Sequence, residues 1–174
     1  MQKRFPTAPW SALLKSMSII ASLLLIGAGC VVWQTIPAIG ASNLVAVLAA
    51  CSFPGIALAA LLFVVTGYEI DGNQLHIQRL LWRTRIDLTS LQEARTDPAA
   101  SQGAIRTAGN GGLFSFTGYY RSPRLGPYEA YVTNSTYSVV IKLLRRVIVV
   151  SPADPAAFVR ELQARFPGLI RDSG

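Results

Sequence analysis

The most informative absence in this sequence is the absence of charge over a long central stretch. From Ser16 to Tyr68 there is no Asp, Glu, Lys, Arg or His; the charges stop at Lys15 and resume at Glu69. One membrane-crossing helix needs about 20 apolar residues, so this stretch is too long for one crossing and suffices for two. It also holds no residue that could relay a proton or bind an ion at membrane depth, which argues against transport.

Cysteine and histidine are scarce as well. The two cysteines, Cys30 and Cys51, both lie in the uncharged stretch, and neither belongs to a Cys-x-x-Cys pair. This pattern supports neither a disulfide framework nor a zinc site. The single histidine, His76, alternates with apolar neighbours, and we expect it to point to solvent from a strand. A histidine-dependent catalytic or metal site would have to use this residue.

Acidic residues are fewer than basic ones. The chain of 174 residues has 9 Asp and Glu against 16 Lys and Arg, a net charge of +7. A basic protein can bind nucleic acid. In a chain with membrane segments, however, the nearest anionic partner is the lipid surface. We therefore predict membrane lipids, and not nucleic acid, as the electrostatic partner.

The uncharged stretch contains two apolar segments separated by turn-forming residues. Residues 16–36 and 44–65 are each long enough to cross a ~30 Å hydrocarbon core as a helix. Between them, residues 37–43 are short and contain Pro, Gly, Ser and Asn. The sequence predicts a two-helix transmembrane hairpin over residues 16–66, preceded by a cytoplasmic tail at 1–15.

Several features within the hairpin bear on its packing. Trp10 and Trp33 flank the first segment, as is typical of the interfacial aromatic belt. Pro54 is expected to kink the second helix. Small residues spaced to share a face would let the helices, or a partner helix, approach closely; they are Ala21, Gly29, Ala46, Ala50, Gly55 and Ala59.

Positive charges flank the hairpin on its outer sides only, and the connecting loop is uncharged. By the positive-inside rule both termini are predicted to be cytoplasmic; the flanking residues are Lys3, Arg4, Lys15, Arg79, Arg83 and Arg85. A cleaved signal peptide is the alternative, because Ala38-Ile39-Gly40 has the small-x-small form of a cleavage site. The first apolar segment is longer than the 7–15 residues of a signal h-region, which argues against cleavage. Cleavage would leave the second helix as the sole anchor.

The hydrophobic period changes to two after Glu69, which predicts a β-rich domain over residues 67–174. Asp71-Gly72-Asn73 is a hairpin turn signal. Asp154 and Pro155 are typical of a helix start, so a helix is expected over 155–166. The strand candidates are 67–70, 74–79, 82–88, 113–120, 128–133, 135–144 and 147–150. The fold class is α+β: a two-helix hairpin, then a sandwich or barrel of six to seven strands capped by a C-terminal helix.

Four segments of this domain resemble a bacterial PH-domain family often found behind membrane helices. They are YEIDGNQLHIQR, IDLTSL, GLFSFTGYYRSPRLGPYEAYVT and VIVVSPADPAAFVREL. The resemblance includes Ile86-Asp87-Leu88 after the first hairpin and the Ser-Pro-x-Asp-Pro segment at 151–155. It implies a PH-like fold of two orthogonal sheets capped by a helix. It implies neither an enzyme nor a known ligand, and no phosphoinositide motif can be matched residue by residue.

Few residues of the domain suggest chemistry. The carboxylates are dispersed, so no catalytic residue, cofactor or metal site is predicted. Gly109-Asn110-Gly111-Gly112 could cradle an anion, but no Lys-Ser/Thr follows it, and a flexible β-loop is expected. Asn134-Ser135-Thr136 is expected to be a turn. The candidate membrane-surface contacts are Arg83 and Arg85 on one strand face and Arg145 and Arg146 in a turn; the alternative is a solvated face with Arg85 paired to Asp87.

Taken alone, the sequence favours a multi-pass protein of a bacterial inner membrane with a cytoplasmic PH-like domain. The function expected is a non-catalytic binding or scaffold module that recruits a protein or lipid. The protein partner is undetermined and could be a second copy or another membrane protein. The alternative is an accessory subunit of a membrane complex, with the helices as the contact surface. An enzyme acting at the membrane is the third class, and it lacks a nucleophile–base pair.

Overall fold

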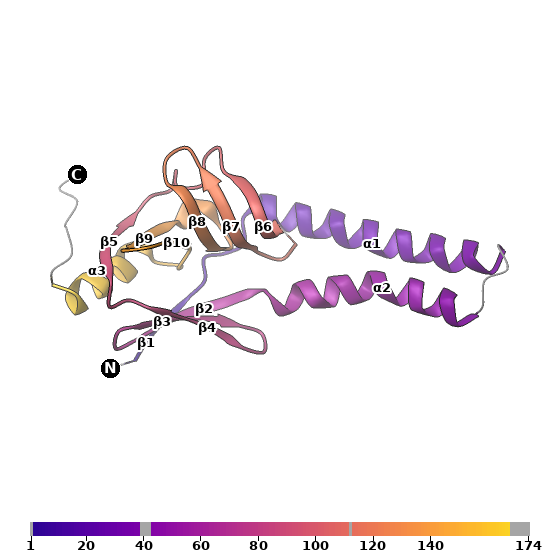
Figure 1. Cartoon of the computed structure of the whole chain (residues 1–174), viewed down its shortest axis with the longest axis horizontal. Coiled ribbons are helices and arrows are strands. Elements are labelled where there is room, and N and C mark those ends of the chain that lie inside the picture. The colour runs from indigo at the N-terminus through magenta and orange to yellow at the C-terminus, as the bar shows by residue number, and fades with distance from the viewer. Residues whose placement is uncertain (1, 39–42, 112, 168–174) are drawn as a thin grey trace.

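The computed structural model describes residues 2–38, 43–111 and 113–167. A long helical hairpin projects from one end of a β-rich domain (Figure 1). The C-terminal helix lies at the far end of that domain from the hairpin.

The hairpin consists of α1 (Ala12–Ala38) and α2 (Asn43–Leu62), which lie side by side along their lengths. Both predicted helices exist, but their limits differ from the prediction. α1 begins at Ala12 because the Ser11 hydroxyl accepts a hydrogen bond from the Leu14 amide and caps the helix. The expected end of the second helix at residue 65 is wrong, because Val65 already pairs with Arg79 in a sheet.

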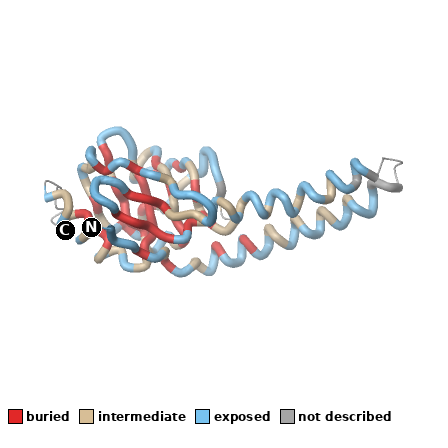
Figure 2. The backbone as a smooth tube through the Cα atoms, turned by 90° about the horizontal axis from the view of Figure 1, so that it is seen from below, coloured by how far each residue is buried: buried red, intermediate tan, exposed pale blue. Residues whose placement is uncertain are grey.

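The described residues of both helices are largely exposed, in contrast to the buried interior of the domain (Figure 2). Within the described residues, one helix is long and apolar enough to cross a membrane by length and composition, over Ala12–Thr35 with a mean hydropathy of 2.1. In α2 the apolar stretch, Val47–Leu62, is shorter and falls below the length required for a span by the same criteria.

The two helices are in close contact at Gly29, which has no side chain. A Cβ added at Gly29 would lie 3.6 Å from the Ala50 carbonyl oxygen and 3.7 Å from Phe53 Cβ. Pro54 lies four residues after Ala50 and has no N–H, so it cannot donate the usual helical hydrogen bond to the Ala50 carbonyl. The predicted close approach at Gly29 and Ala50 is therefore confirmed as contact within the hairpin.

The domain contains two sheets and ten described strands, so the expected number of six to seven is wrong. The first sheet has the order β1-β2-β3-β4 and the second β5-β9-β10-β8-β7-β6. All neighbouring strands are antiparallel except β10 and β8, which are parallel. The strands are β1 Lys3–Pro6, β2 Val65–Asp71, β3 Gln74–Arg79, β4 Arg83–Asp87, β5 Leu91–Thr96, β6 Ile105–Gly111, β7 Phe116–Ser122, β8 Gly126–Val132, β9 Val139–Leu143 and β10 Val147–Val150.

Strand β1 is the element that changes the organisation of the chain. It precedes the helices, yet it pairs with β2, which follows them, with Phe5 opposite Tyr68. Residues 1–15 were expected to be a tail, but Lys3–Pro6 belong to the first sheet and Ala12 onward to α1. The helical hairpin is thus an insertion between two paired strands.

The connection from β1 to α1 is tied to the second sheet by hydrogen bonds. The Ala8 amide donates to the Ser151 carbonyl at 2.8 Å, and the Thr133 hydroxyl donates to the Ala8 carbonyl at 3.0 Å. The Asn134 side-chain amide donates to the Pro9 carbonyl at 3.0 Å. Both sheets therefore hold the start of α1.

The core lies between the sheets and under α3 (Pro155–Arg165). Asp154 caps α3 by accepting from the Ala157 amide at 2.8 Å, as predicted. Phe158 and Leu162 are fully buried, and Phe158 packs edge-on against Phe5 with ring centroids 5.0 Å apart. The central strands β9 and β10 are largely buried on both faces, which explains their apolar sequences, interrupted in β9 by the partly exposed Lys142.

Candidate functional site at the junction of the helices and the two sheets

Arg79 occupies the end of β3, beside the point where α2 enters the domain. Its Nη1 donates to the Phe63 carbonyl at 2.8 Å, and its Nε donates to the Thr84 hydroxyl at 3.2 Å. Phe63 follows the last residue of α2, so its carbonyl is one of those left without a partner at a helix end. Arg79 therefore donates a hydrogen bond at the C-terminal end of α2 and places a positive charge there, where the helix dipole favours a cation.

Three aromatic rings surround the Arg79 guanidinium. Its central carbon lies 5.4 Å from the ring centroid of Phe63, 5.9 Å from that of Trp82 and 5.5 Å from that of Tyr131. Burial lowers the pKa of Arg79 from its ordinary value, while the Tyr131 hydroxyl acts in the opposite direction. Because arginine stays protonated in proteins, this site holds a half-buried positive charge.

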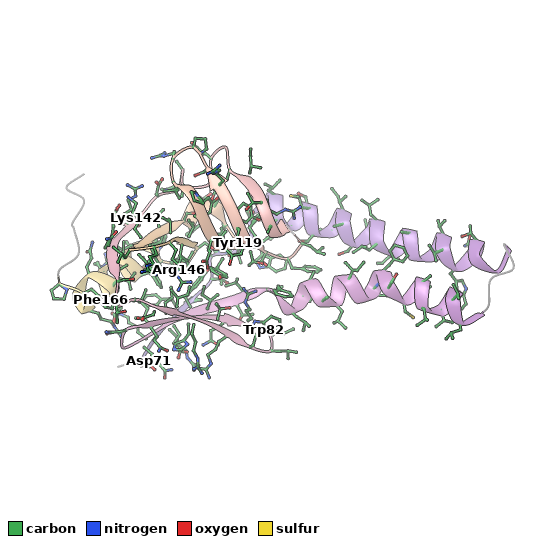
Figure 3. The ribbon with its side chains drawn as sticks, viewed as in Figure 1. Asp71, Trp82, Tyr119, Lys142, Arg146 and Phe166 are labelled. Carbon is green, nitrogen blue, oxygen red and sulfur yellow. The ribbon has the colours of Figure 1, made fainter. Side chains whose placement is uncertain are left out.

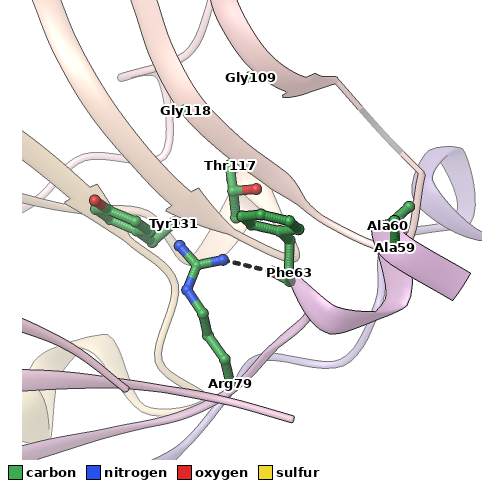
Figure 4. A pocket seen from close by; sticks show the side chains of 8 residues that line it. All are labelled: Ala59, Ala60, Phe63, Arg79, Gly109, Thr117, Gly118 and Tyr131. Atoms are coloured by element: carbon green, nitrogen blue, oxygen red, sulfur yellow. Dashed lines mark hydrogen bonds between the residues drawn. The ribbon is translucent and has the colours of Figure 1, made fainter. Parts of the chain in front are cut away.

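A pocket of about 410 Å³ opens beside this guanidinium, between α2 and the second sheet (Figure 4). Its walls are mostly apolar or without side chains. Gly109 and Gly118 face each other on β6 and β7, and Cβ atoms there would lie 2.5 and 2.3 Å from backbone oxygens. The remaining lining residues are Ala59, Ala60, Phe63, Thr117 and Tyr131.

Exposed apolar residues extend from this junction at the foot of the hairpin. The β3–β4 turn carries Leu80 and Leu81, which are 59% and 74% exposed, and Trp82 packs edge-on against Phe63. On the α1 side, the Phe114 amide donates to the Ser18 hydroxyl at 2.9 Å. Trp82 lies toward the helices, whereas Asp71 and Phe166 lie toward the opposite end of the domain (Figure 3).

The structure does not bring the four candidate arginines together. Arg83 and Arg85 are exposed on the outer face of the first sheet, with Arg83 next to Trp82 at the helix end. Arg145 and Arg146 lie in the turn between β9 and β10, beside Asp87 at the far end of β4. Arg146 pairs with Glu129 at 3.5 Å. The proposed pairing of Arg85 with Asp87 is absent from the ion pairs of the described residues.

His76 is buried, at 6% exposure, so the expectation that it points to solvent is wrong. It stands between Glu69 and Arg85 in the register of the first sheet. Glu69 is fully buried and accepts hydrogen bonds from Gln2 and Arg4. Burial alone would raise the pKa of Glu69, but these bonds and the charges of Arg4 and His76 leave it below its ordinary value.

Two predicted loop motifs have ordinary structural roles. Gly109–Gly111 form the end of strand β6, so the expected flexible loop is wrong there, and Gly112 lies outside the described residues. Asn134 caps a short 3-10 turn, Ser135–Tyr137, by accepting from the Thr136 amide at 3.1 Å. The expected turn is confirmed.

The chemistry this arrangement offers is binding. Within the described ranges, no group of three or more His, Cys, Asp and Glu residues could hold a metal ion. The junction instead combines one half-buried cation with apolar walls. Arg79 was expected only as a positive charge flanking the hairpin and not as part of a site, although the alternation of Leu75, Ile77 and Arg79 places all three on the inward face of β3.

Two sheets closed by a C-terminal helix define the chain as a PH-like protein, a class of generally non-catalytic binding modules. Residues 66–166 match the family described as bacterial PH domain. The chain belongs to this family, and the resemblance noted in the sequence is confirmed. No curated protein and no solved structure matches the chain.

Proposed function

We propose that this protein is a binding or scaffold module anchored in a bacterial inner membrane by both helices. The observation that carries the proposal is the pairing of β1 with β2. Because β1 precedes the hairpin, β2 follows it and the two strands are paired, both ends of the hairpin lie on the same side of any membrane that it enters. The chain therefore crosses an even number of times. If α1 spans the membrane, α2 must return.

The length and composition of α2 support this return. Its residues Asn43–Leu62 make a helix of about 30 Å, equal to a typical hydrocarbon core. Its exposed surface is apolar, with Leu44, Leu48, Ile56 and Leu58 all more than half exposed. Such a surface requires lipid or protein to cover it.

The domain is proposed to be cytoplasmic. Lys3 and Arg4 precede the helices, Lys15 lies near the start of α1, and Arg79 and Arg83 follow α2, whereas the sequence between the helices has no charge. This asymmetry favours retention of the flanks in the cytoplasm.

Cysteine labelling of the full chain tests the orientation. With Cys30 and Cys51 replaced by Ala, Ser42→Cys should react with a membrane-impermeant maleimide on intact cells, and Asn73→Cys should react only after lysis. Labelling of Asn73→Cys from outside would overturn the orientation. Recovery of the protein in the soluble fraction would overturn the anchoring itself.

A second role, as an accessory subunit of a membrane complex, is favoured by one further observation. A hollow of about 660 Å³ lies between the helices, lined by residues such as Leu25, Trp33 and Pro54. A partner helix or lipid chains could occupy it. A photo-cross-linking residue at Leu58 would capture such a partner, and one at Tyr119 would capture a partner of the domain; the two roles predict opposite results.

A further inference from the structure

The pocket beside Arg79 combines a half-buried positive charge with apolar walls. In the described part of the chain, Arg79 makes no ion pair with an acid, unlike Arg4, Arg95 or Arg146. Burying an uncompensated charge is costly. The aromatic rings and the Phe63 carbonyl offset part of that cost, but none of these groups carries a negative charge.

The guanidinium retains donors for a ligand. It has five N–H groups in a planar fork, and the hydrogen bonds to Phe63 and Thr84 use two of them. The remaining donors suit the oxygens of a phosphate, to which arginine binds in a bidentate manner.

The walls of the pocket point to a ligand with an apolar part. Ala59 and Ala60 belong to the last turn of α2, so the apolar wall continues from the pocket onto the exposed surface of that helix at Ile56. An acyl chain can follow this surface toward the membrane centre. A soluble anion would leave it uncovered.

We propose that this pocket binds one anionic phospholipid of the cytoplasmic leaflet, with the phosphate on Arg79 and an acyl chain along α2. The inference rests on the proposed membrane anchoring. It differs from a general attraction of basic residues to the membrane, because it assigns one arginine and a shaped cavity to one lipid molecule.

The test is lipid retention by the full-length protein, measured by native mass spectrometry with dioleoylphosphatidylglycerol and dioleoylphosphatidylcholine as probes. The wild type should retain the anionic lipid preferentially. Arg79→Gln should lower the affinity of the protein for the anionic lipid about 10-fold, because one charge-assisted hydrogen-bonded contact is lost. Arg160→Gln is the matched control, since Arg160 is an exposed arginine on α3, and it should leave retention unchanged.

Arg79→Gln also removes the hydrogen bond to the Phe63 carbonyl at the end of α2. A second variant distinguishes that effect from loss of the lipid contact. Ala60→Phe fills the pocket while leaving Arg79 and its bonds in place, and it should lower retention of phosphatidylglycerol to a similar extent. Arg79→Lys keeps the charge but loses the planar fork, so its retention should fall between the wild type and Arg79→Gln. Wild-type retention by Ala60→Phe or Arg79→Gln would overturn the proposal.

Two further outcomes are decisive. If glycerol 3-phosphate displaces phosphatidylglycerol completely at equal concentration, the pocket is a soluble-anion site and the lipid assignment is wrong. If the variants bind lipid like the wild type while the protein stays in the membrane after carbonate extraction, only this inference fails. Release of the wild type by carbonate would contradict the anchoring instead.

Discussion

At the scale of single residues, Tyr68 links the first sheet to the segment that precedes α3. Its hydroxyl donates to the Tyr131 carbonyl at 2.6 Å and accepts from the Ser151 amide at 3.0 Å. Burial raises the pKa of Tyr68 to about 12, although the bonds to Ser151 act in the opposite direction.

We expect Tyr68→Phe to reduce the free energy of unfolding by about 1–3 kcal/mol, because two buried backbone groups lose their partner. The pH dependence should change too. Since the folded pKa lies above the ordinary value of 10, the stability from the neutral hydroxyl is complete below pH 10 and is lost as pH rises toward about 12. Thermal unfolding between pH 7 and 11 should therefore show a shallower alkaline decline in the variant; an identical slope would contradict this.

Gly118 is a second residue with a defined physical requirement. Its φ of +132° disfavours side chains, and a Cβ would lie 2.3 Å from the Ala108 carbonyl oxygen. We expect Gly118→Ala to cost more than about 3 kcal/mol, because the strained backbone and the overlap with the Ala108 carbonyl add. Gly72→Ala is the control, because Gly72 has a positive φ of 53° but open space around it, and it should cost about 1–2 kcal/mol. If chemical denaturation gives the same loss in the free energy of unfolding for both variants, the close approach of β6 and β7 does not determine the cost of Gly118→Ala.

At the scale of elements, β1 contributes both hydrogen bonds and an apolar side chain to the domain. Phe5 is buried against Phe158, and Lys3 makes an ion pair with Glu161 on α3 at 2.7 Å. The family match begins at residue 66, after this strand. The domain that folds is therefore longer than the matched segment.

A domain without its first strand should be unstable. We expect Phe5→Ala to lower stability by about 3–5 kcal/mol, the usual cost of removing a buried aromatic side chain. A soluble variant in which residues 2–11 are joined to 64–174 by a short Gly-Ser linker should unfold cooperatively, whereas residues 66–166 alone should not. Cooperative unfolding of the shorter piece, monitored by circular dichroism, would show that β1 is dispensable.

Much at this scale could be predicted from local sequence. The Asp71-Gly72-Asn73 turn, the cap of α3 and the helix that follows it were all expected, because each depends on residues close in the chain. Strands β1, β5 and β6 were missed. Their sequences alternate weakly, and β1 is stabilised by a partner strand on the far side of the helices.

At the scale of the whole molecule, the exposed apolar hairpin and the folded domain require different surroundings. Both helices enter the domain side by side, and aromatic residues lie where they enter: Trp10 lies at a tilted angle to Phe114, and Phe63 packs edge-on against Trp82. Such a ring of aromatic side chains suits the interface between lipid and water.

A charge placed on the exposed face of α2 tests this arrangement. We expect Ile56→Lys to disfavour insertion by about 2–3 kcal/mol if the helix crosses the membrane, and to increase the fraction released by carbonate. Ile105→Lys adds the same charge on the exposed surface of the domain and should leave the membrane fraction unchanged. Equal membrane fractions for both variants would indicate that α2 does not cross.

The sequence by itself determined the helices, the period-two domain and the family, because apolar runs, alternation and turn residues act over short distances. Only the tertiary structure decided which distant segments meet. It joined β1 to β2 around the helices, which makes the N-terminal segment part of the domain. It buried His76 between Glu69 and Arg85, and it enclosed Arg79 between Phe63 and Tyr131. These results depend on strand register and on the packing of two sheets, which bring together residues that no local pattern connects.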